Sequence, residues 1–284
     1  MEVLTIDRNH CNIGEVEHPF TIDFTKDDVR ITTHYYEKDF ASSMYSVIHE
    51  GGHALYELHI GDDIKYSTLG GGASMSIHES QSRFFENIIG RSEAFLTYIL
   101  PDVQKLGPKA LKAVTPHDFY RAVNKSQPSC IRTEADELTY SFHIMIRYEL
   151  EKRLFAGTLA VKDLPAAWNA LYKEYLGVDV PNDTQGVLQD SHWSGGAFGY
   201  FPSYALGSAY GAQYLRKMGE SLDLDGCLRR GDFAPINGWF RERIWRHGCL
   251  LTPAQVFRRA VGEDFDPRVY ADYLEEKFGG LYGL

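Results

Sequence analysis

Two histidines and a glutamate lie within a run of five residues: His49, Glu50 and His53, with Gly51 and Gly52 between them. Residues four apart on an α-helix lie one turn apart on the same face, so both imidazole rings can reach one metal ion. The carboxylate of Glu50 can then reach a water molecule at that metal and remove its proton. The spacing therefore indicates metal-assisted hydrolysis.

The segment around these residues, 43–62, has the pattern of a core helix. At 100° per residue, the apolar side chains fall opposite His49, whereas His53 falls about 40° from it. Asp39 can cap the start of this helix and Gly61 its end. Each glycine inside the helix costs roughly 1 kcal/mol relative to alanine, so we interpret Gly51 and Gly52 as points of close approach by another backbone or a substrate. Together these features favour the His-Glu-x-x-His helix of zinc peptidases over an ordinary helix with surface histidines.

A tetrahedral metal site of this kind takes a third protein ligand and leaves the fourth position for water. We predict that the third ligand is Glu79, in the first turn of a helix expected over 76–100 that would cross the first helix. As an alternative role, Glu79 fits a capping box that begins at Ser76. Three other carboxylates stay open as ligands: Glu57, Asp62 and Asp63.

Two further charged residues have both a functional and a structural interpretation. Glu86 follows Glu79 by about two helical turns on the same face, where it can orient a ligand histidine or form a surface ion pair. Arg132 lies at the very start of a helix expected over about 132–155. An arginine beside exposed helix N–H groups can bind a carboxylate, and the structural alternative is a salt bridge.

A glycine-rich loop within 186–204 carries His192, Trp193, Tyr200 and Tyr204. Histidine or tyrosine donors in such a loop can stabilise the oxyanion that forms when a peptide bond is attacked. The helix that follows is rich in alanine, glycine and serine, so we expect it to pack closely against a neighbour.

The remaining pattern predicts one mainly α-helical domain over 1–284, with a small antiparallel β-sheet beside the metal helix. Segments 20–24 and 29–36 are the strand candidates. They form either a structural hairpin or an edge that pairs with an extended peptide. Residues 1–17 show little periodicity and are expected to be loosely held. The triple glycine 70–72 lets the backbone pass close to another group.

Composition narrows the class of protein. Of the 284 residues, 44% are hydrophobic and 24% are charged, as in globular proteins. The formal net charge of −10 and the lack of a basic patch with aromatic residues argue against nucleic acid as a partner. No apolar run approaches the roughly 18 residues of a membrane span, and the start has no signal-peptide pattern. Four scattered cysteines favour reduced thiols and a cytoplasmic protein.

Six motifs, in order, resemble the carboxypeptidase Taq metallopeptidases, also called thermostable carboxypeptidases. The match runs over almost the whole chain from His18 onward. The motifs are His18-Pro19-Phe20, Asp28-Val29-Arg30-Ile31-Thr32, His49-Glu50-Gly51-Gly52-His53, His78-Glu79-Ser80-Gln81, Ile131-Arg132-Thr133-Glu134-Ala135-Asp136 and Gly186-Val187-Leu188-Gln189-Asp190-Ser191-His192-Trp193.

The resemblance implies a neurolysin-like zincin fold with a deep cleft, and a metal-dependent carboxypeptidase that removes C-terminal amino acids from peptides. By motif, His49, His53 and Glu79 would be the ligands of a zinc ion, which cobalt can replace. Glu50 would be the general base.

The resemblance also implies residues that hold the substrate. Arg132 would lie in the stretch that receives the C-terminal carboxylate of the peptide. His192 and a downstream tyrosine would face the scissile carbonyl group. Tyr204 is the first choice for that tyrosine, and Tyr200 is the second.

One departure from the family concerns the start of the chain. Family members carry a large helical half upstream of the segment that matches His18, whereas this chain has seventeen residues there. The family's frequent homodimers suggest a homodimer. The short start suggests instead a catalytic half, or a non-catalytic remnant, that needs a complementing N-terminal chain to complete the cleft. A further alternative is an endopeptidase or dipeptidyl carboxypeptidase built on the same metal site.

Overall fold

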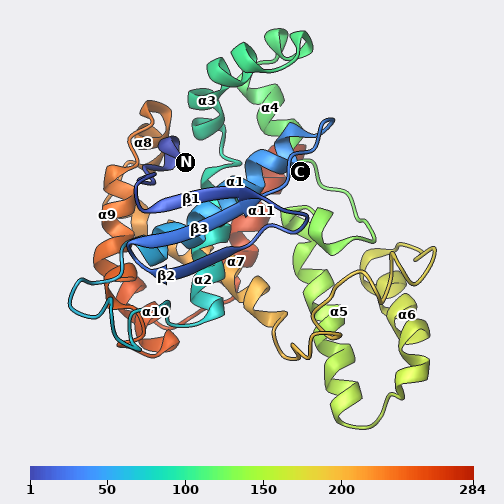
Figure 1. Cartoon of the computed structure of the whole chain (residues 1–284). Coiled ribbons are helices and arrows are strands. Elements are labelled where there is room, and N and C mark those ends of the chain that lie inside the picture. Colours follow the sequence, from blue (N-terminus) through green and yellow to red (C-terminus); the bar gives the residue numbers. More distant parts are fainter. The chain divides into compact units, whose positions relative to one another are not determined.

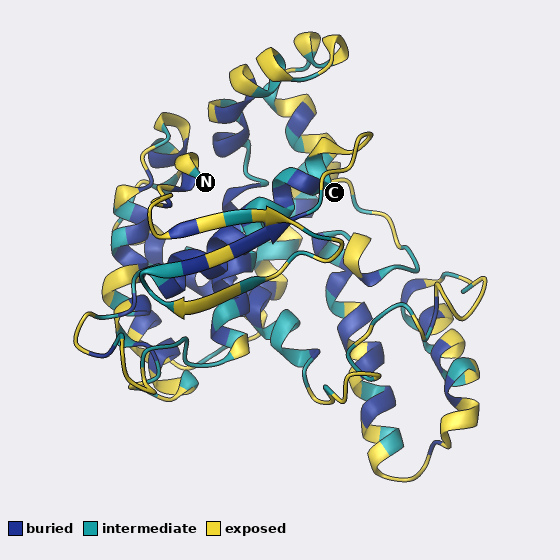
Figure 2. Cartoon of the chain, in the orientation of Figure 1, coloured by how far each residue is buried: buried dark blue, intermediate teal, exposed yellow.

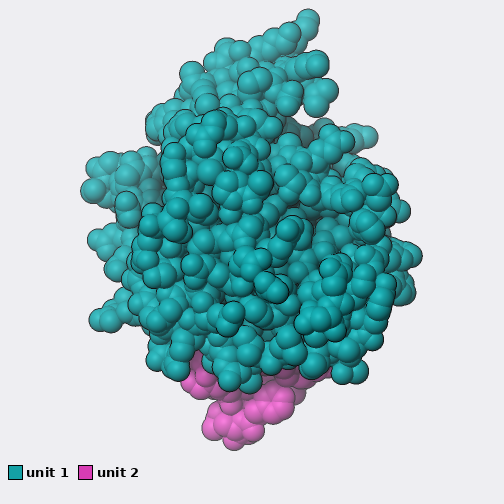
Figure 3. Space-filling model, turned by 90° about the vertical axis from the view of Figure 1, so that its left-hand side faces the viewer, with its two compact units in different colours: residues 1–123, 206–284 teal, residues 124–205 magenta.

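The computed structural model describes residues 1–284. The chain forms eleven α-helices and one three-stranded sheet, which confirms the mainly helical class (Figure 1). Its contacts group the residues into two compact units, distinguished by colour in Figure 3: unit 1 is Met1–Val123 with Leu206–Leu284, and unit 2 is Asn124–Ala205. The prediction of a single domain over 1–284 stays a prediction. None of the helices combines the length and the apolar character needed to cross a bilayer.

Most of the helices belong to unit 1. They are α1 (Phe40–Leu58), α2 (Met75–Arg83), α3 (Glu93–Leu106), α4 (Pro116–Val123), α7 (Pro202–Gly219, from Leu206 on), α8 (Leu224–Arg230), α9 (Ala234–Arg243), α10 (Pro253–Val261) and α11 (Arg268–Tyr282). Unit 2 contains α5 (Glu137–Phe155) and α6 (Leu164–Leu176).

The sheet has the order β1-β3-β2, with strands β1 (Cys11–Glu15), β2 (Thr21–Thr25) and β3 (Asp28–Thr33). β2 and β3 form the predicted antiparallel hairpin, with Ile22 opposite Arg30. β1 pairs with the other edge of β3 in parallel, with Cys11 opposite Val29. The expected sheet is therefore present, but it is mixed rather than antiparallel, because the chain crosses from one edge of β3 to the other between β1 and β2.

The prediction that residues 1–17 are loosely held is wrong. A 3-10 turn, Glu2–Leu4, precedes β1, and the side chains of Leu4, Ile6 and Cys11 are buried. The apolar residues of this segment are separated by polar ones, so neither a helical nor a strand period shows in the sequence. Their burial comes from contacts with residues far along the chain, which a local pattern does not reveal.

Helix α1 begins as predicted, with the carboxylate of Asp39 accepting a hydrogen bond of 3.0 Å from the backbone N–H of Ser42. It ends at Leu58, and its C-cap is His59, two residues before the expected cap, Gly61. β2 and β3 pack on α1, and Figure 2 shows buried residues concentrated on β3 and α1. The metal motif therefore lies on a helix held inside unit 1.

The two glycines inside α1 mark close contacts on two sides of the helix. A Cβ atom on Gly51 would lie 2.8 Å from Cδ1 of Leu4. A Cβ atom on Gly52 would lie 2.6 Å from Cα of Ser82 and 2.7 Å from the carbonyl oxygen of Gln81. The interpretation that another backbone approaches this helix is confirmed at Gly52, where α2 crosses α1.

The helix expected over 76–100 is two helices joined by a wider turn. α2 is capped by Ser74, whose hydroxyl accepts from the N–H of Ile77. The capping box from Ser76 to Glu79, given above as the alternative role of Glu79, is therefore not formed. A π-helical turn, Phe84–Ile89, follows α2, and Ser92 caps α3. The apolar residues are continuous across this break, so periodicity alone predicts one helix.

Helix α7 packs closely on its neighbour, as its small residues predicted. A Cβ atom on Gly207 would lie 2.6 Å from Cβ and 2.7 Å from the carbonyl carbon of Glu79. A Cβ atom on Gly211 would lie 3.2 Å from Cδ1 of Ile88. The contact at Gly207 fixes the backbone of α2 at the residue predicted to be the third metal ligand.

In unit 2, α5 and α6 pack around a small core of Ile146, Leu150, Trp168 and Tyr172. The long helix expected from residue 132 begins at Glu137, after a 3-10 turn, Arg132–Glu134. Asp136 caps it by accepting from the N–H of Thr139.

The contact at Gly52 gives a test of the α1–α2 packing. We expect Gly52→Ala to lower the free energy of unfolding by about 1–3 kcal/mol, because the added methyl group would overlap the backbone of α2. The control is Gly238→Ala in α9, where nothing lies within 4 Å of the added Cβ atom. That change should raise the free energy of unfolding by up to about 1 kcal/mol, from helix propensity. Equal effects in denaturant titrations would contradict the close contact.

Candidate metal centre

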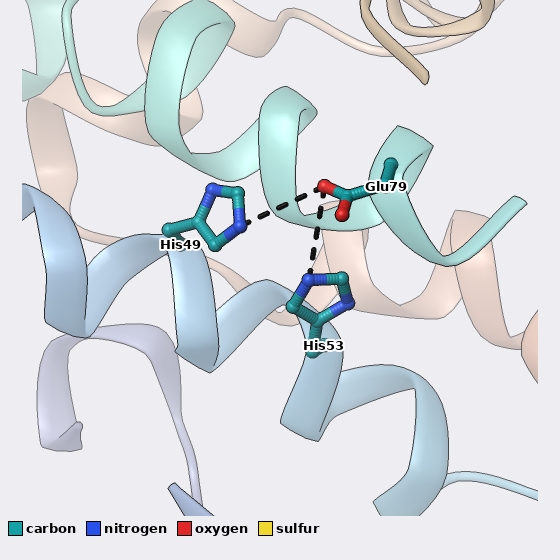
Figure 4. A group of neighbouring side chains, drawn as sticks. All are labelled: His49, His53 and Glu79. Atoms are coloured by element: carbon teal, nitrogen blue, oxygen red, sulfur yellow. Dashed lines mark ion pairs between the residues drawn. The ribbon is translucent and has the colours of Figure 1, made fainter. Parts of the chain in front are cut away.

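Three side chains from two helices point toward one another in unit 1 (Figure 4). Oε2 of Glu79 on α2 lies 3.7 Å from Nε2 of His49 and 3.8 Å from Nε2 of His53, both on α1. Each of the three residues offers one ligand atom, and these atoms lie within 4.8 Å of one another. Two protein atoms that each bind one ion at about 2.1 Å lie at most about 4.2 Å apart. Both distances from Oε2 of Glu79 to the histidine nitrogens are within this limit, so one ion can bridge Glu79 and either histidine.

The chemistry of the three donors fits a zinc ion. Two imidazole nitrogens and one carboxylate oxygen make a three-ligand set that leaves a fourth position open, and cobalt accepts similar ligands. His53 and Glu79 are buried, and His49 is partly buried. Burial lowers the pKa of His53 well below its ordinary value, and His49, His78 and Arg83 act in the same direction. Burial therefore favours the neutral form of His53, which is the form that binds a metal.

Glu79 is held in place by its own helix. The hydroxyl group of Ser82 donates a hydrogen bond of 2.9 Å to Oε2 of Glu79. The close contact with Gly207 holds the backbone beneath it. The Ser82 hydroxyl and the contact with α7 thus orient the carboxylate toward the two histidines.

Glu86 contacts the first histidine, as the sequence suggested. Its Oε2 lies 2.8 Å from Nδ1 of His49 and 3.2 Å from Nη1 of Arg83. Burial acts to raise the pKa of Glu86, but Arg83, His49 and Arg91 together hold it far below its usual range. The ionised carboxylate can accept the Nδ1 proton of His49, which leaves Nε2 of that ring free for a metal.

The other carboxylates that remained open as ligands lie elsewhere. Asp62 accepts a hydrogen bond of 2.7 Å from Lys26, and Asp63 is exposed. Oε1 of Glu57 lies 2.6 Å from Nε2 of His78 and accepts from the N–H of Gly72. None of the three belongs to the group of ligand atoms formed by His49, His53 and Glu79.

Glu50 is buried beside the two histidines, with 7% of its surface exposed. The hydroxyl group of Thr21 on β2 donates to its Oε2 at 2.6 Å. Burial raises the pKa of Glu50; His49 and the hydrogen bond from Thr21 oppose the rise. Sequence reasoning missed Thr21, because its contact with Glu50 depends on how the hairpin packs on α1.

In unit 2, Arg132 is held by an aspartate and a tyrosine. Its Nη2 and Nε donate to Oδ1 of Asp190 at 2.7 and 3.0 Å, and its Nη1 donates to Tyr140 at 2.9 Å. The salt bridge given above as the alternative is therefore present. A second buried arginine, Arg147, donates from Nε to Oδ2 of the same carboxylate at 2.8 Å. Sequence reasoning missed Arg147, which sits on α5 without a recognisable motif.

The three aromatic candidates of the glycine-rich loop gather in one cluster of unit 2. Nε2 of His192 lies 3.1 Å from the hydroxyl oxygen of Tyr204. The ring of Tyr200 is centred 5.4 Å from that of His192 and 5.3 Å from that of Tyr204. The guanidinium carbon of Arg132 lies 4.9 Å from the centre of the Tyr204 ring. The residues predicted to face a substrate thus contact one another.

Comparison with known proteins decides the family. The family model described as carboxypeptidase Taq (M32) metallopeptidase matches residues 1–278. The chain belongs to this family.

Named relatives agree with the assignment to the carboxypeptidase Taq family. Carboxypeptidase 1 of Bacillus subtilis (strain 168) is 46% identical over 285 residues, covering 100% of this chain and 57% of that protein. Thermostable carboxypeptidase 1 of Thermus thermophilus is 43% identical over 267 residues, covering 94% and 52%. The crystal structure of the M32 carboxypeptidase from Deinococcus radiodurans R1 superposes with a TM-score of 0.96 at 41% identity, covering 100% and 58%.

The chain spans about half the length of the curated relatives that it matches. Within that span, membership of a metallopeptidase family implies a metal, and His49, His53 and Glu79 form the group in this chain that fits one.

Asp190 forms ion pairs with two buried arginines of unit 2, Arg132 and Arg147, so its charge should contribute strongly to stability. We expect Asp190→Asn to lower the free energy of unfolding by about 3–5 kcal/mol, because it leaves two buried guanidinium groups without their counter-charge. The control is Asp179→Asn, whose side chain is 87% exposed beside Lys173; it should change stability by no more than about 0.5 kcal/mol.

The pH dependence of this difference gives a second measurement. Burial acts to raise the pKa of Asp190, but Arg132 and Arg147 hold it below its ordinary value. The stabilisation is therefore fully present above the unfolded-state pKa of about 3.9 and is lost as the pH falls through the lowered pKa. Denaturant titrations should show that the difference in unfolding free energy between the unaltered chain and Asp190→Asn becomes smaller below about pH 3.9. A gap that stays constant into acid would contradict the ion-pair assignment.

Proposed function

We propose that this chain carries the catalytic centre of a metal-dependent carboxypeptidase that removes C-terminal amino acids from peptides. The convergence of His49, His53 and Glu79 on one point is the observation that carries the proposal. Membership of the carboxypeptidase Taq family and the names of the relatives supply the reaction class. Zinc is the proposed metal, with cobalt as the alternative, because both accept this donor set.

When bound, the metal supplies a Lewis acid that acidifies water and polarises the carbonyl group to be attacked. Glu50 is the proposed general base. Its carboxylate takes a proton from the attacking water and later delivers it to the leaving amine. The hydrogen bond from Thr21 holds one carboxylate oxygen of Glu50 in place. Burial raises the pKa of Glu50, which makes its carboxylate a better proton acceptor.

The other substrate contacts are proposed from the resemblance to the carboxypeptidase Taq family. Tyr204, or Tyr200 in second place, donates its hydroxyl proton to the carbonyl oxygen as negative charge develops there. His192 orients that hydroxyl through the contact between its Nε2 and Tyr204. Arg132 is the proposed partner of the substrate's terminal carboxylate. It would use its remaining N–H groups, since Nε and one N–H each of Nη1 and Nη2 already donate to Asp190 and Tyr140.

A second candidate function follows from the length of the chain relative to its relatives. The chain spans 57% of the Bacillus subtilis relative and 52% of the Thermus thermophilus relative. The second candidate is therefore a metal centre whose cleft is completed by another chain. In that case the isolated chain binds metal but cleaves peptides only with a complementing N-terminal chain. A homodimer is the other assembly that we propose to test by size-exclusion chromatography.

The role of Glu50 is tested by Glu50→Gln. We expect this variant to bind zinc as the unaltered chain does and to lose about 10²–10⁴-fold in the rate of peptide hydrolysis, because the general base is absent. The control is Glu242→Gln, an exposed residue that pairs with Arg246, which should leave the rate unchanged. Metal analysis and single-turnover hydrolysis give the two readings. Retained turnover in Glu50→Gln would refute the base assignment.

The choice between a carboxypeptidase and an endopeptidase is tested with one peptide in two forms. We expect mass spectra of the free-acid peptide to show stepwise loss of single residues from the C-terminus. The C-terminal amide should be cut much more slowly, because it lacks the carboxylate proposed to bind Arg132. Internal fragments from both forms at equal rates would contradict the proposal. Cleavage only after adding a complementing chain would support the second candidate function.

A further inference from the structure

We propose that His78 and Glu57 are positioning residues that fix the tautomer of His53, so that its Nε2 presents a lone pair to the metal. The metal-binding part of this proposal rests on the proposed function. The tautomer itself follows from the contacts of the metal-free chain. Neither residue belongs to the predicted ligands, and Glu57 was considered above only as an alternative ligand.

The three side chains form a continuous line that leads away from the metal centre. Nδ1 of His53 lies 3.1 Å from Nδ1 of His78. Nε2 of His78 lies 2.6 Å from Oε1 of Glu57. The backbone N–H of Gly72 donates to the same oxygen at 3.1 Å. His53 and Glu57 are buried, with 8% and 4% of their surfaces exposed, so water has little access to replace these contacts.

The contact of Glu57 with the backbone N–H of Gly72 sets the direction of the hydrogen bonds in this line. A backbone N–H can only donate, which marks Oε1 of Glu57 as an accepting oxygen. An ionised Glu57 can only accept, so its contact with His78 then places a proton on Nε2 of His78. A neutral His78 ring then has a lone pair on Nδ1, so Nδ1 of His53 must donate to it. A neutral His53 ring that carries its proton on Nδ1 has its lone pair on Nε2, the atom that faces Glu79.

The two histidines of α1 thus reach the same tautomer by different routes. His49 contacts the carboxylate of Glu86 directly. His53 contacts a second imidazole ring, and the carboxylate of Glu57 lies one step further away. A ligand histidine commonly donates its second ring N–H to a carboxylate, a backbone carbonyl or water. An imidazole acceptor can serve here only if its own tautomer is fixed, and Glu57 supplies that condition.

One of the three glycines at 70–72, Gly72, is required by the space that the His78 ring occupies. A Cβ atom on Gly72 would lie 2.4 Å from both Cδ2 and Nε2 of His78, and 3.0 Å from Cε1 of Tyr56. Any larger residue would push the His78 ring away from Glu57 or tilt it. A Cβ atom on Gly71 would meet nothing within 4 Å. These neighbouring glycines therefore make a matched pair of test positions.

The first experiment reads the tautomers in the unaltered, metal-free chain. Long-range ¹H–¹⁵N correlation spectra of ¹⁵N-histidine-labelled protein distinguish the protonated from the unprotonated ring nitrogen. We expect His53 with its proton on Nδ1 and His78 with its proton on Nε2. His53 protonated on Nε2 alone, or His78 protonated on both nitrogens, would overturn the proposal. This result does not depend on whether the chain is a peptidase.

The second experiment measures affinity for Zn²⁺ and Co²⁺ by competition with a chromophoric chelator. We expect Gly72→Ala and His78→Phe to weaken binding by about 10- to 100-fold, with Gly71→Ala matching the unaltered chain. Equal affinity in all four proteins would overturn the proposal. An unaltered chain that binds neither ion would refute the proposed function, while the tautomer spectra would still decide the arrangement of His53 and His78. If Gly72→Ala and His78→Phe fail to fold, the spectra of the unaltered chain remain the deciding test.

Discussion

The close crossing of α1 and α2 is the contact on which the metal centre depends. At Gly52 the two backbones approach so closely that a single Cβ atom would lie 2.6 Å from Cα of Ser82. Three residues earlier along α2, Glu79 faces the two histidines, and Gly207 of α7 lies against the backbone and Cβ of Glu79. α2 is therefore in close contact with a glycine of α1 and with a glycine of α7. Such contacts have little freedom to slide, because any sideways movement brings backbone atoms into overlap.

The same compact region contains a high density of ionisable groups. Glu50, Glu57, Glu79 and His53 are all buried, and burial of unpaired charges is costly. The structure compensates by giving each of them a specific neighbour: Thr21 for Glu50, Ser82 for Glu79, and His78 for both Glu57 and His53. In unit 2, Asp190 with Arg132 and Arg147 follows the same rule. The sites are therefore ordered by hydrogen bonding as well as by packing.

What the sequence predicted and what it missed can be separated by the range of the contacts. The start of α1, the convergence of His49 and His53, and the hairpin of β2 and β3 depend on local spacing, and the structure agrees with them. The convergence of Glu79 on the two histidines also agrees, although it rested on choosing one carboxylate among several. The parallel pairing of β1, the burial of Leu4 and Ile6, and the contact of Thr21 with Glu50 depend on residues far apart in the chain, where periodicity gives no information. The break after α2 was missed because the apolar pattern continues through it.

The packing of Leu4 and Ile6 on α1 at Gly51 ties the first turn of the chain to the helix that carries both histidines. Truncating either side chain would leave a void against the backbone of α1 at Gly51. The order of the helix that carries both histidines therefore depends in part on two apolar residues far from it in the sequence.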